Sequence, residues 1–539
     1  EAFAEWMAHK VCHAIEPSYE VWNDFIEDKI RVLYDDALHS THPIWTPVET
    51  PDQALEMFDS ITYQKGCAVM RMLEHFLGED SFRSGLRAYM KEFQYGNACG
   101  PDLWRALEKA SSLPVHSLMQ SWVTQSGYPV VDLDLVERDD GAVLSLRQER
   151  FFSDAQSRPS DQLWAIPMTV RYADDEGVKT HRFIFDSRAQ TVKLATTGKV
   201  RFVYANQDEI GFYRQRMTQE TLAKLLPIAV SVLSPVELVG LLEDNWAMVR
   251  NGSISITSFL AVLSACSAAR DHNVLRVIAD RIDGLDLLVK DAGDTSARQK
   301  LRSLAEQRFA PHLTELGFVP RAGEPQNDVQ RRAICITTLA STARVQSVIR
   351  EVELLAQAEM VNPRAVDPNL AGPFVAIAAK FGDEPRYDRW VETFQTRKAA
   401  GKTPQEVARY LHTLSHFRRP ELVQRTLQLI EQGMIPQEAV AAILAQLLSF
   451  RHSQLSAWEF LKQHWGTLRE RFGDMGVSRV VDALGRLRQS ERADVVRFFE
   501  ENKPAGAERA LKRALERIDQ GEELRQRVTR ELLSYLLAL

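Results

Sequence analysis

Two pairs of histidines have spacings that metal sites use. His9 and His13 are four residues apart in H-K-V-C-H, and His39 and His42 are three apart in a proline-rich segment. Residues four apart share one face of a helix, so the first pair could bind one ion. Glu5 lies one turn earlier, but about 12 Å of helix axis separates it from His13, which is too far for a shared ion. We therefore interpret both pairs as solvated or packing histidines.

A single tyrosine, Tyr63, is a different kind of candidate. It lies in the segment Asp59–Gly78, which begins D-S-I-T-Y-Q-K-G, and we expect this segment to start as a loop and pass into a helix. Val69, Leu73 and Phe76 then recur at helical spacing, which predicts a buried helix face. A tyrosine at the mouth of such a helix can point its hydroxyl group into a cleft while packing fixes its ring. A half-buried packing residue is the ordinary interpretation, and the segment alone leaves both open.

Composition and motifs exclude several classes of function. The sequence has 66 Lys and Arg residues against 73 Asp and Glu residues, a net charge of −7, which disfavours nucleic acid as a partner. No apolar run reaches the length of a membrane span. No H-E-x-x-H, G-x-S-x-G, phosphate-binding glycine loop or dinucleotide fingerprint occurs. The five cysteines, Cys12, Cys67, Cys99, Cys266 and Cys335, have no C-x-x-C spacing, which favours a reducing compartment and a cytoplasmic location.

Helices must position the candidate groups, because residues 1–127 show helical periodicity almost throughout. An irregular, proline-containing segment is expected at 39–51, before the Tyr63 segment. The helical periodicity ends at Gly127-Tyr128-Pro129. The predicted helices are 1–13, 19–37, the helix after Tyr63, 81–92, 101–111 and 115–125.

The period changes at Pro129, where apolar and polar residues alternate as in half-buried strands. Two hairpins are predicted, with turns at Asp139-Asp140-Gly141 and 174–177, followed by two shorter strands, which together suggest a small β-sandwich. From residue 216 to the end, helical segments recur between prolines and glycines, as in an α-solenoid of the HEAT-like kind. The predicted fold is therefore multidomain and mainly α, with domains at 1–127, 128–215 and 216–539.

A set of short patterns occurs in fixed order along the first 215 residues. Together they resemble the gluzincin zinc aminopeptidases, the family of aminopeptidase N and puromycin-sensitive aminopeptidase. The resemblance is strong over 1–215 and architectural over 216–539, where the family carries a helical C-terminal domain. The patterns are E-A-F-A-E-W-M at 1–7, D-D-A-L-H-S-T-H-P-I at 35–44, F-D-S-I-T-Y-Q-K-G at 58–66, Y-G-N-A at 95–98, D-L-W-R-A-L at 102–107, W-V-T-Q-S-G-Y-P-V at 122–130, Q-E-R-F at 148–151, W-A-I-P at 164–167 and N-Q-D-E-I-G-F-Y-R at 206–214.

The resemblance implies a zinc ion and two site residues. In the family, two histidines of H-E-x-x-H and a glutamate on a following helix hold one zinc ion, whose bound water attacks the peptide bond. The glutamate lies in a pattern like W-L-N-E-G-F-A, so the E-A-F-A match makes Glu1 the expected third zinc ligand. The tyrosine of [ST]-Y-x-K-G donates to the oxyanion, so Tyr63 is the expected catalytic residue. Peptides with a free N-terminus are the implied substrates.

The departure from the family is equally plain. The sequence holds neither H-E-x-x-H nor the G-x-M-E-N pattern that binds the substrate amine in the family, and both would lie upstream of Glu1. One carboxylate cannot hold zinc with useful affinity. We therefore expect this chain to be the C-terminal part of an aminopeptidase and to be inactive alone. The alternative is a non-catalytic scaffold that binds peptides or proteins through the β-sandwich and the helical solenoid, which would have no use for Tyr63.

Overall fold

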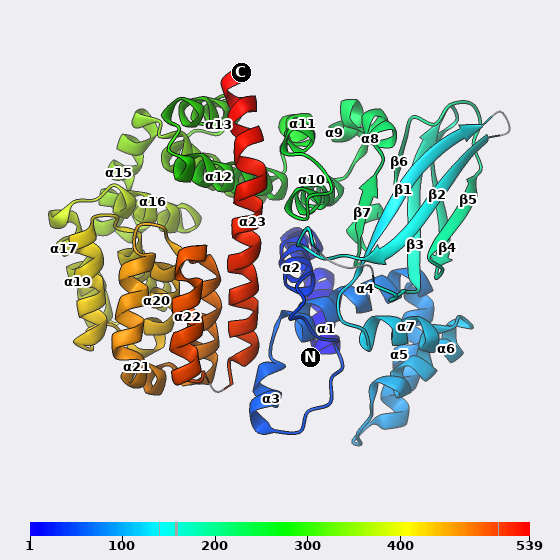
Figure 1. Cartoon of the computed structure of the whole chain (residues 1–539), viewed down its shortest axis with the longest axis horizontal. Helices are drawn as coiled ribbons and strands as arrows, with labels where there is room; N and C mark the ends of the chain where they lie inside the picture. The colour runs from blue at the N-terminus through cyan, green and yellow to red at the C-terminus, as the bar shows by residue number, and fades with distance from the viewer. Residues whose placement is uncertain (139–140, 157–159, 505) are drawn as a thin grey trace. The chain divides into compact units, whose positions relative to one another are not determined.

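The structure, a computed structural model, is mainly helical with one small β region (Figure 1). This confirms the predicted fold class. The chain divides into two compact units, Glu1–Ala269 and Arg270–Leu539. The division into 1–127, 128–215 and 216–539 stays a prediction. The residues that the structure describes are 1–138, 141–156, 160–504 and 506–539.

The first unit begins with helices close to the predicted ones. The segment expected to be irregular, 39–51, is followed by a short helix that the sequence analysis did not predict and that begins at Pro51. Pro51 suits a first helical position, and the Thr50 hydroxyl group caps the helix by accepting from Gln53 N–H. The helices are α1 (Ala2–Ile15), α2 (Val21–Asp36), α3 (Pro51–Glu56), η2 (Ile61–Lys65), α4 (Gly66–Leu77), α5 (Glu79–Phe93), α6 (Gly100–Ser111) and α7 (Val115–Val123).

Helix α4 is the centre of this helical part. Its Val69 and Leu73 are buried, as the periodicity predicts, and Phe76 is partly buried against the same core. Trp6 of α1 and Phe82 of α5 pack on this core with their ring centroids 5.1 Å apart. Burying a large apolar side chain contributes about 1.5–3 kcal/mol, so these contacts fix α4 and the segment before it.

Among the described residues of the first unit, seven strands form two sheets. One sheet has the order β5-β2-β1-β7 and the other the order β4-β3-β6. Their inward-facing residues share one buried core, which agrees with the predicted small sandwich. Two residues of the first predicted turn, Asp139 and Asp140, lie outside the described residues. The strands are β1 (Pro129–Arg138), β2 (Gly141–Arg150), β3 (Ile166–Asp174), β4 (Gly177–Phe185), β5 (Ala189–Leu194), β6 (Phe202–Tyr204) and β7 (Arg214–Met217).

Strand β7 has no counterpart among the predicted strands. It pairs in parallel with β1, with Val130 opposite Arg214 and Leu133 opposite Met217. Its sequence, R-Q-R-M, is too short and too polar to show a period of two. The strand returns the chain to the edge of the first sheet and so leads it into the helices that follow. These are α8 (Gln219–Leu225), α9 (Ala229–Val232), α10 (Pro235–Arg250) and α11 (Ile256–Ala265).

The second unit is an array of helices, as predicted for the solenoid. Successive helices pack in pairs, such as α15 with α16 and α20 with α21, and the long α23 contacts α12, α13 and α21. Within the described residues, we find no helix whose length and apolarity would suffice to cross a membrane. The helices are α12 (His272–Ala292), α13 (Thr295–Leu316), α14 (Gln326–Thr338), η6 (Leu339–Ala343), α15 (Gln346–Val361), α16 (Pro368–Lys380), α17 (Glu384–Ala399), α18 (Pro404–Thr413), η8 (Leu414–His416), α19 (Pro420–Glu431), α20 (Gln437–Ser449), α21 (Gln454–Ala483), α22 (Gln489–Glu501) and α23 (Glu508–Ala538).

Candidate active site

Tyr63 lies inside a five-residue π-helix, η2, that leads directly into α4. The sequence predicted a loop at this point, so the helical backbone extends one turn further toward the N-terminus than expected. Single π turns are rare, occur mostly within α-helices and are frequent at functional sites. The Tyr63 side chain is half-buried, and its ring lies 6.3 Å from that of Phe58, centroid to centroid. The ring is thus held by neighbours while part of the side chain stays accessible.

Asp59 starts this π-helix. One of its carboxylate oxygens accepts from the backbone N–H groups of Ile61 and Thr62, at 3.0 and 3.2 Å. Its other oxygen lies 2.8 Å from His42 Nε2, and His42 Nδ1 lies 2.8 Å from the carbonyl oxygen of Pro43. His42 therefore orients the Asp59 carboxylate. This contact agrees with the interpretation of His42 as a packing histidine. Nothing in the sequence pattern pointed to this pair.

Lys65 fixes the far end of the π-helix. Its ammonium group lies 2.8 Å from Asp36 of α2, and both side chains are fully buried. Lys65 also donates to the carbonyl oxygen of Gly127 at 2.9 Å, while Gly127 N–H donates to Asp36 at 3.0 Å. Burial lowers the pKa of Lys65, and the Asp36 carboxylate acts in the opposite direction. The lysine of the T-Y-Q-K-G motif thus holds the end of the π-helix in place through a buried ion pair.

Gly66 brings helix α1 against the same segment. A Cβ atom added at Gly66 would lie 2.4 Å from Ala2 Cβ, a distance that real Cβ atoms do not show. Only glycine allows this approach, which accounts for the glycine of the motif. The contact places the first turn of α1 beside η2. Glu1, the N-cap residue of α1, therefore stands on the element that packs directly on the Tyr63 segment, with an exposed side chain.

Helices α1 and α4 are also joined by polar contacts further along. Glu74 of α4 accepts from Trp6 Nε1 at 3.1 Å, and its other oxygen lies 2.6 Å from the ammonium group of Lys10. Lys10 follows His9, the first histidine of the pair His9 and His13, and its side chain faces α4. His9 instead lies against its own helix, with Nδ1 2.9 Å from the Glu5 carbonyl oxygen.

The described residues do not by themselves make a zinc site. Among them we find no group of three or more His, Cys, Asp or Glu side chains that could hold a metal ion. His39 lies 2.7 Å from Asp154 and stacks on Phe152. Glu1, the predicted third ligand, has an exposed carboxylate, a group that can bind zinc. It is a single donor, however, and a catalytic zinc ion takes three from the protein.

A buried carboxylate, Glu209, ties three parts of the first unit together. It lies in the pattern N-Q-D-E-I-G-F-Y-R and has a left-handed backbone, with φ of 52°. Its side chain lies 2.8 Å from the ammonium group of Lys29 on α2 and accepts from Tyr204 at 2.5 Å on β6. Gly240 of α10 approaches so closely that an added Cβ would lie 2.2 Å from Glu209. The pattern therefore contributes to the packing of α2, β6 and α10 against one another.

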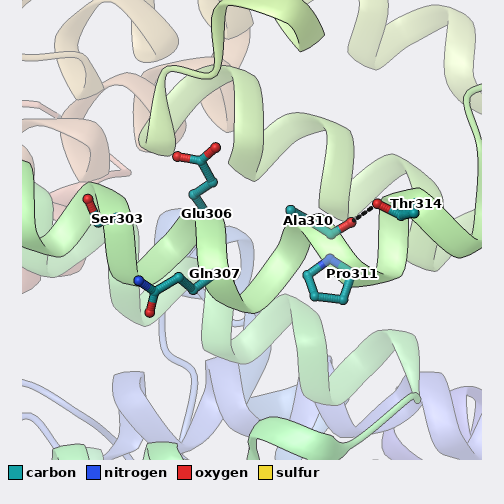
Figure 2. Close-up of a pocket in the computed structure, with 6 residues that line it drawn as sticks. All are labelled: Ser303, Glu306, Gln307, Ala310, Pro311 and Thr314. Carbon is teal, nitrogen blue, oxygen red and sulfur yellow. Dashed lines mark hydrogen bonds between the residues drawn. The ribbon is translucent and has the colours of Figure 1, made fainter.

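A hollow of about 680 Å³ lies along α13 in the second unit. Figure 2 shows that every residue drawn at its wall comes from that one helix. Glu306 is the only one of these six residues with an acidic or basic side chain, and Thr314 donates to the Ala310 carbonyl oxygen within its own helix. These residues therefore do not gather groups for chemistry. They are Ser303, Glu306, Gln307, Ala310, Pro311 and Thr314.

Comparison with known proteins adds independent support. The family model described as "Peptidase family M1 domain" matches residues 1–122. The family model described as "ERAP1-like C-terminal domain" matches residues 202–520, which is more than half of the chain. "Puromycin-sensitive aminopeptidase" of Caenorhabditis elegans is 30% identical over 75% of this chain. "Aminopeptidase M1-B" of Oryza sativa subsp. japonica is 28% identical over 96%, and "Aminopeptidase 2" of Candida albicans is 25% identical over 100%. The chain spans 44%, 59% and 58% of the lengths of these three relatives.

Proposed function

The chain belongs to the M1 family of aminopeptidases, and on that premise we propose that it forms part of a zinc-dependent enzyme that removes N-terminal residues from peptides. In this proposal, Tyr63 donates a hydrogen bond to the oxyanion that forms on the substrate, and Glu1 is one of the zinc ligands. The two histidines and the general base would come from an H-E-x-x-H segment, which this sequence does not contain. A cytoplasmic location remains part of the proposal.

One observation carries the proposal above the others. Tyr63 lies on a π turn that is fixed at one end by Asp59 and at the other by Lys65. Helix α1, whose N-cap residue is Glu1, packs beside that turn through the contact of Ala2 with Gly66. A packing tyrosine would not need a turn held at both ends. An oxyanion donor does, because its hydroxyl group must already point at the place where charge develops.

The division of work follows from the residue types. Bound zinc would activate water and polarise the scissile carbonyl group as a Lewis acid. Glu1 would contribute a hard carboxylate oxygen and one negative charge to the metal site. The Tyr63 phenol would supply an O–H group that can donate a hydrogen bond to the developing oxyanion.

Peptides that differ only at their N-terminus test the proposal. We expect the full gene product to release the first residue from a peptide with a free amino group and to leave the N-acetylated peptide intact, as measured by mass spectrometry. Removal of zinc with a chelator should abolish this release, and added zinc should restore it. A zinc-loaded product that binds both peptides without cleaving either would favour the scaffold alternative instead.

Replacing Glu1 tests the ligand assignment separately. In the same gene product, Glu1→Ala should lower zinc affinity by more than the roughly 10- to 100-fold that loss of an outer-sphere partner costs, because a direct ligand is removed. Zinc content after dialysis measures the effect. Glu220→Ala, which removes an exposed carboxylate from α8, is the matched control and should retain its zinc. Normal zinc content in Glu1→Ala would show that the assignment is wrong.

A further inference from the structure

Cations gather at one edge of the second unit, where a series of helices ends. Arg344 follows η6, Lys380 is the last residue of α16, and Arg418 follows η8. At each of these helix ends the cation is adjacent to an apolar residue in the sequence: Ala343, Phe381 and Phe417. We call Arg344, Lys380 and Arg418 the basic edge.

Packing between the helix ends brings the basic edge together. The Arg344 guanidinium lies over the Phe381 ring, 4.8 Å from its centroid. Gly382 approaches Phe417 so closely that an added Cβ would lie 2.4 Å from the ring. The ends of η6, α16 and η8 are therefore in direct contact, and the three cations that they carry belong to one surface.

The series continues for one more helix. The rings of His416 and Phe450 lie 5.1 Å apart, which joins the end of η8 to the end of α20. His452 stacks on Phe450 at 5.6 Å. Arg451, at the corresponding place after α20, lies 3.5 Å from Asp291 and so has a carboxylate partner. The basic edge differs from this neighbour in having none.

The nearby carboxylates are already engaged elsewhere. Asp286 binds Arg298 through two hydrogen bonds of 2.8 Å, and Asp283 accepts from Thr342 at 3.1 Å. Among the described residues, none forms an ion pair with Arg344, Lys380 or Arg418. Several further cations lie close enough to the basic edge to repel its charges, so positive charge is in excess there. They are Lys290, Arg298 and Arg302.

The ionisation of these groups reflects that excess. Burial and then repulsion from Arg418 lower the pKa of Lys380 to about 7, while Asp283 and Asp286 act in the opposite direction and Arg344 adds to the repulsion. Burial also lowers the pKa of Arg344 to about 10, again with Arg418 as the strongest repelling charge. Without a ligand, the basic edge therefore holds its positive charges against both burial and each other. Such an arrangement is typical of binding sites.

We propose that the basic edge, formed by Arg344, Lys380 and Arg418, binds a compact oxyanion with two or more negative charges, such as a phosphate group. Guanidinium groups match oxyanions through paired hydrogen bonds, and an ammonium group adds a point charge. Two guanidinium groups and one ammonium group on adjoining helix ends therefore provide both the geometry and the charge. The anion would also fasten η6, α16 and η8 to one another.

Binding of inorganic phosphate and pyrophosphate by the whole chain tests the proposal. Isothermal titration calorimetry at pH 6.5, where Lys380 is mostly protonated, should detect saturable binding, with pyrophosphate tighter than phosphate. Chloride at the same ionic strength should not compete. Arg418→Gln should weaken binding about tenfold or more, because it removes a charge-assisted hydrogen bond to the oxyanion. No peptidase activity is needed, so the outcome is independent of the proposed function.

Two further variants keep the test decisive. Lys380→Met removes a repelled charge, so it should fold at least as well as the parent chain and yet bind pyrophosphate about tenfold less tightly. Arg364→Gln removes an exposed charge near the other end of α16, about 18 Å along the helix, and should bind like the parent chain. Equal affinity in all four proteins, or equal displacement by chloride, would overturn the proposal.

Discussion

Replacing Tyr63 with phenylalanine should lower kcat of the gene product on a free-amino peptide by about 10²–10³-fold, the usual cost of losing one oxyanion donor. The substitution removes one oxygen atom and leaves the ring that packs near Phe58 in place. Zinc content should not change, since the hydroxyl group acts on the substrate. KM should change little, because the lost interaction is made in the transition state and not in the ground state.

A matched control separates chemistry from packing at this site. Tyr95→Phe removes the hydroxyl group of a fully exposed tyrosine and should leave kcat unchanged. A packing role for Tyr63 predicts a different result, in which Tyr63→Phe keeps nearly full kcat and only Tyr63→Ala, which also removes the ring, loses activity. That result would exclude Tyr63 as the oxyanion donor.

Replacing Lys65 with methionine should lower the free energy of unfolding of the first unit by about 3–5 kcal/mol, the cost of leaving one member of a buried ion pair without its partner. Asp36 would then remain fully buried with its charge uncompensated. Urea unfolding, followed by tryptophan fluorescence, measures the change as a lower midpoint with a similar slope. Lys91→Met, which removes an exposed charge from α5, is the control and should change the midpoint little.

A double variant tests whether the loss comes from the pair. Lys65→Met combined with Asp36→Leu removes both charges, so it should recover much of the stability that Lys65→Met loses, because an apolar replacement of a buried pair is often neutral. If the two single effects simply add, then Lys65 and Asp36 are not coupled and another contact of Lys65, such as that with Gly127, accounts for the loss.

Most of the fold could be predicted because periodicity reports which face of an element is buried. The helix that carries Val69 and Leu73 and the first hairpin of the sandwich are examples. Strand β7 was missed because four polar residues carry no period, and its pairing depends on a partner strand some 80 residues earlier in the chain. Helix α3 was missed because a proline indicates irregular structure as readily as a helix start, and here Pro51 occupies the first helical position behind the Thr50 cap.

Some residues of the candidate site could be proposed from the sequence, and others could be found only in the structure. Tyr63 and Glu1 could be proposed as site residues because each lies in a short motif, and a resemblance transfers motifs residue by residue; both assignments stay predictions. Their supports were not accessible. His42 orients Asp59 across 17 residues, and Asp36 pairs with Lys65 across an intervening helix and loop, and neither contact leaves a spacing that sequence can reveal. The close contact between Gly66 and the Ala2 side chain likewise forms only when the chain folds.

The buried contact between Lys29 and Glu209 has a consequence for synthesis of the protein. The two residues are 180 positions apart, so a ribosome that adds about 5–20 residues per second needs roughly 9–36 s to pass from one to the other. Throughout that interval α2 lacks the carboxylate that Lys29 binds and the strand β6 that supports it. The nascent helical part therefore completes its buried core only after the strands that share this core have been made.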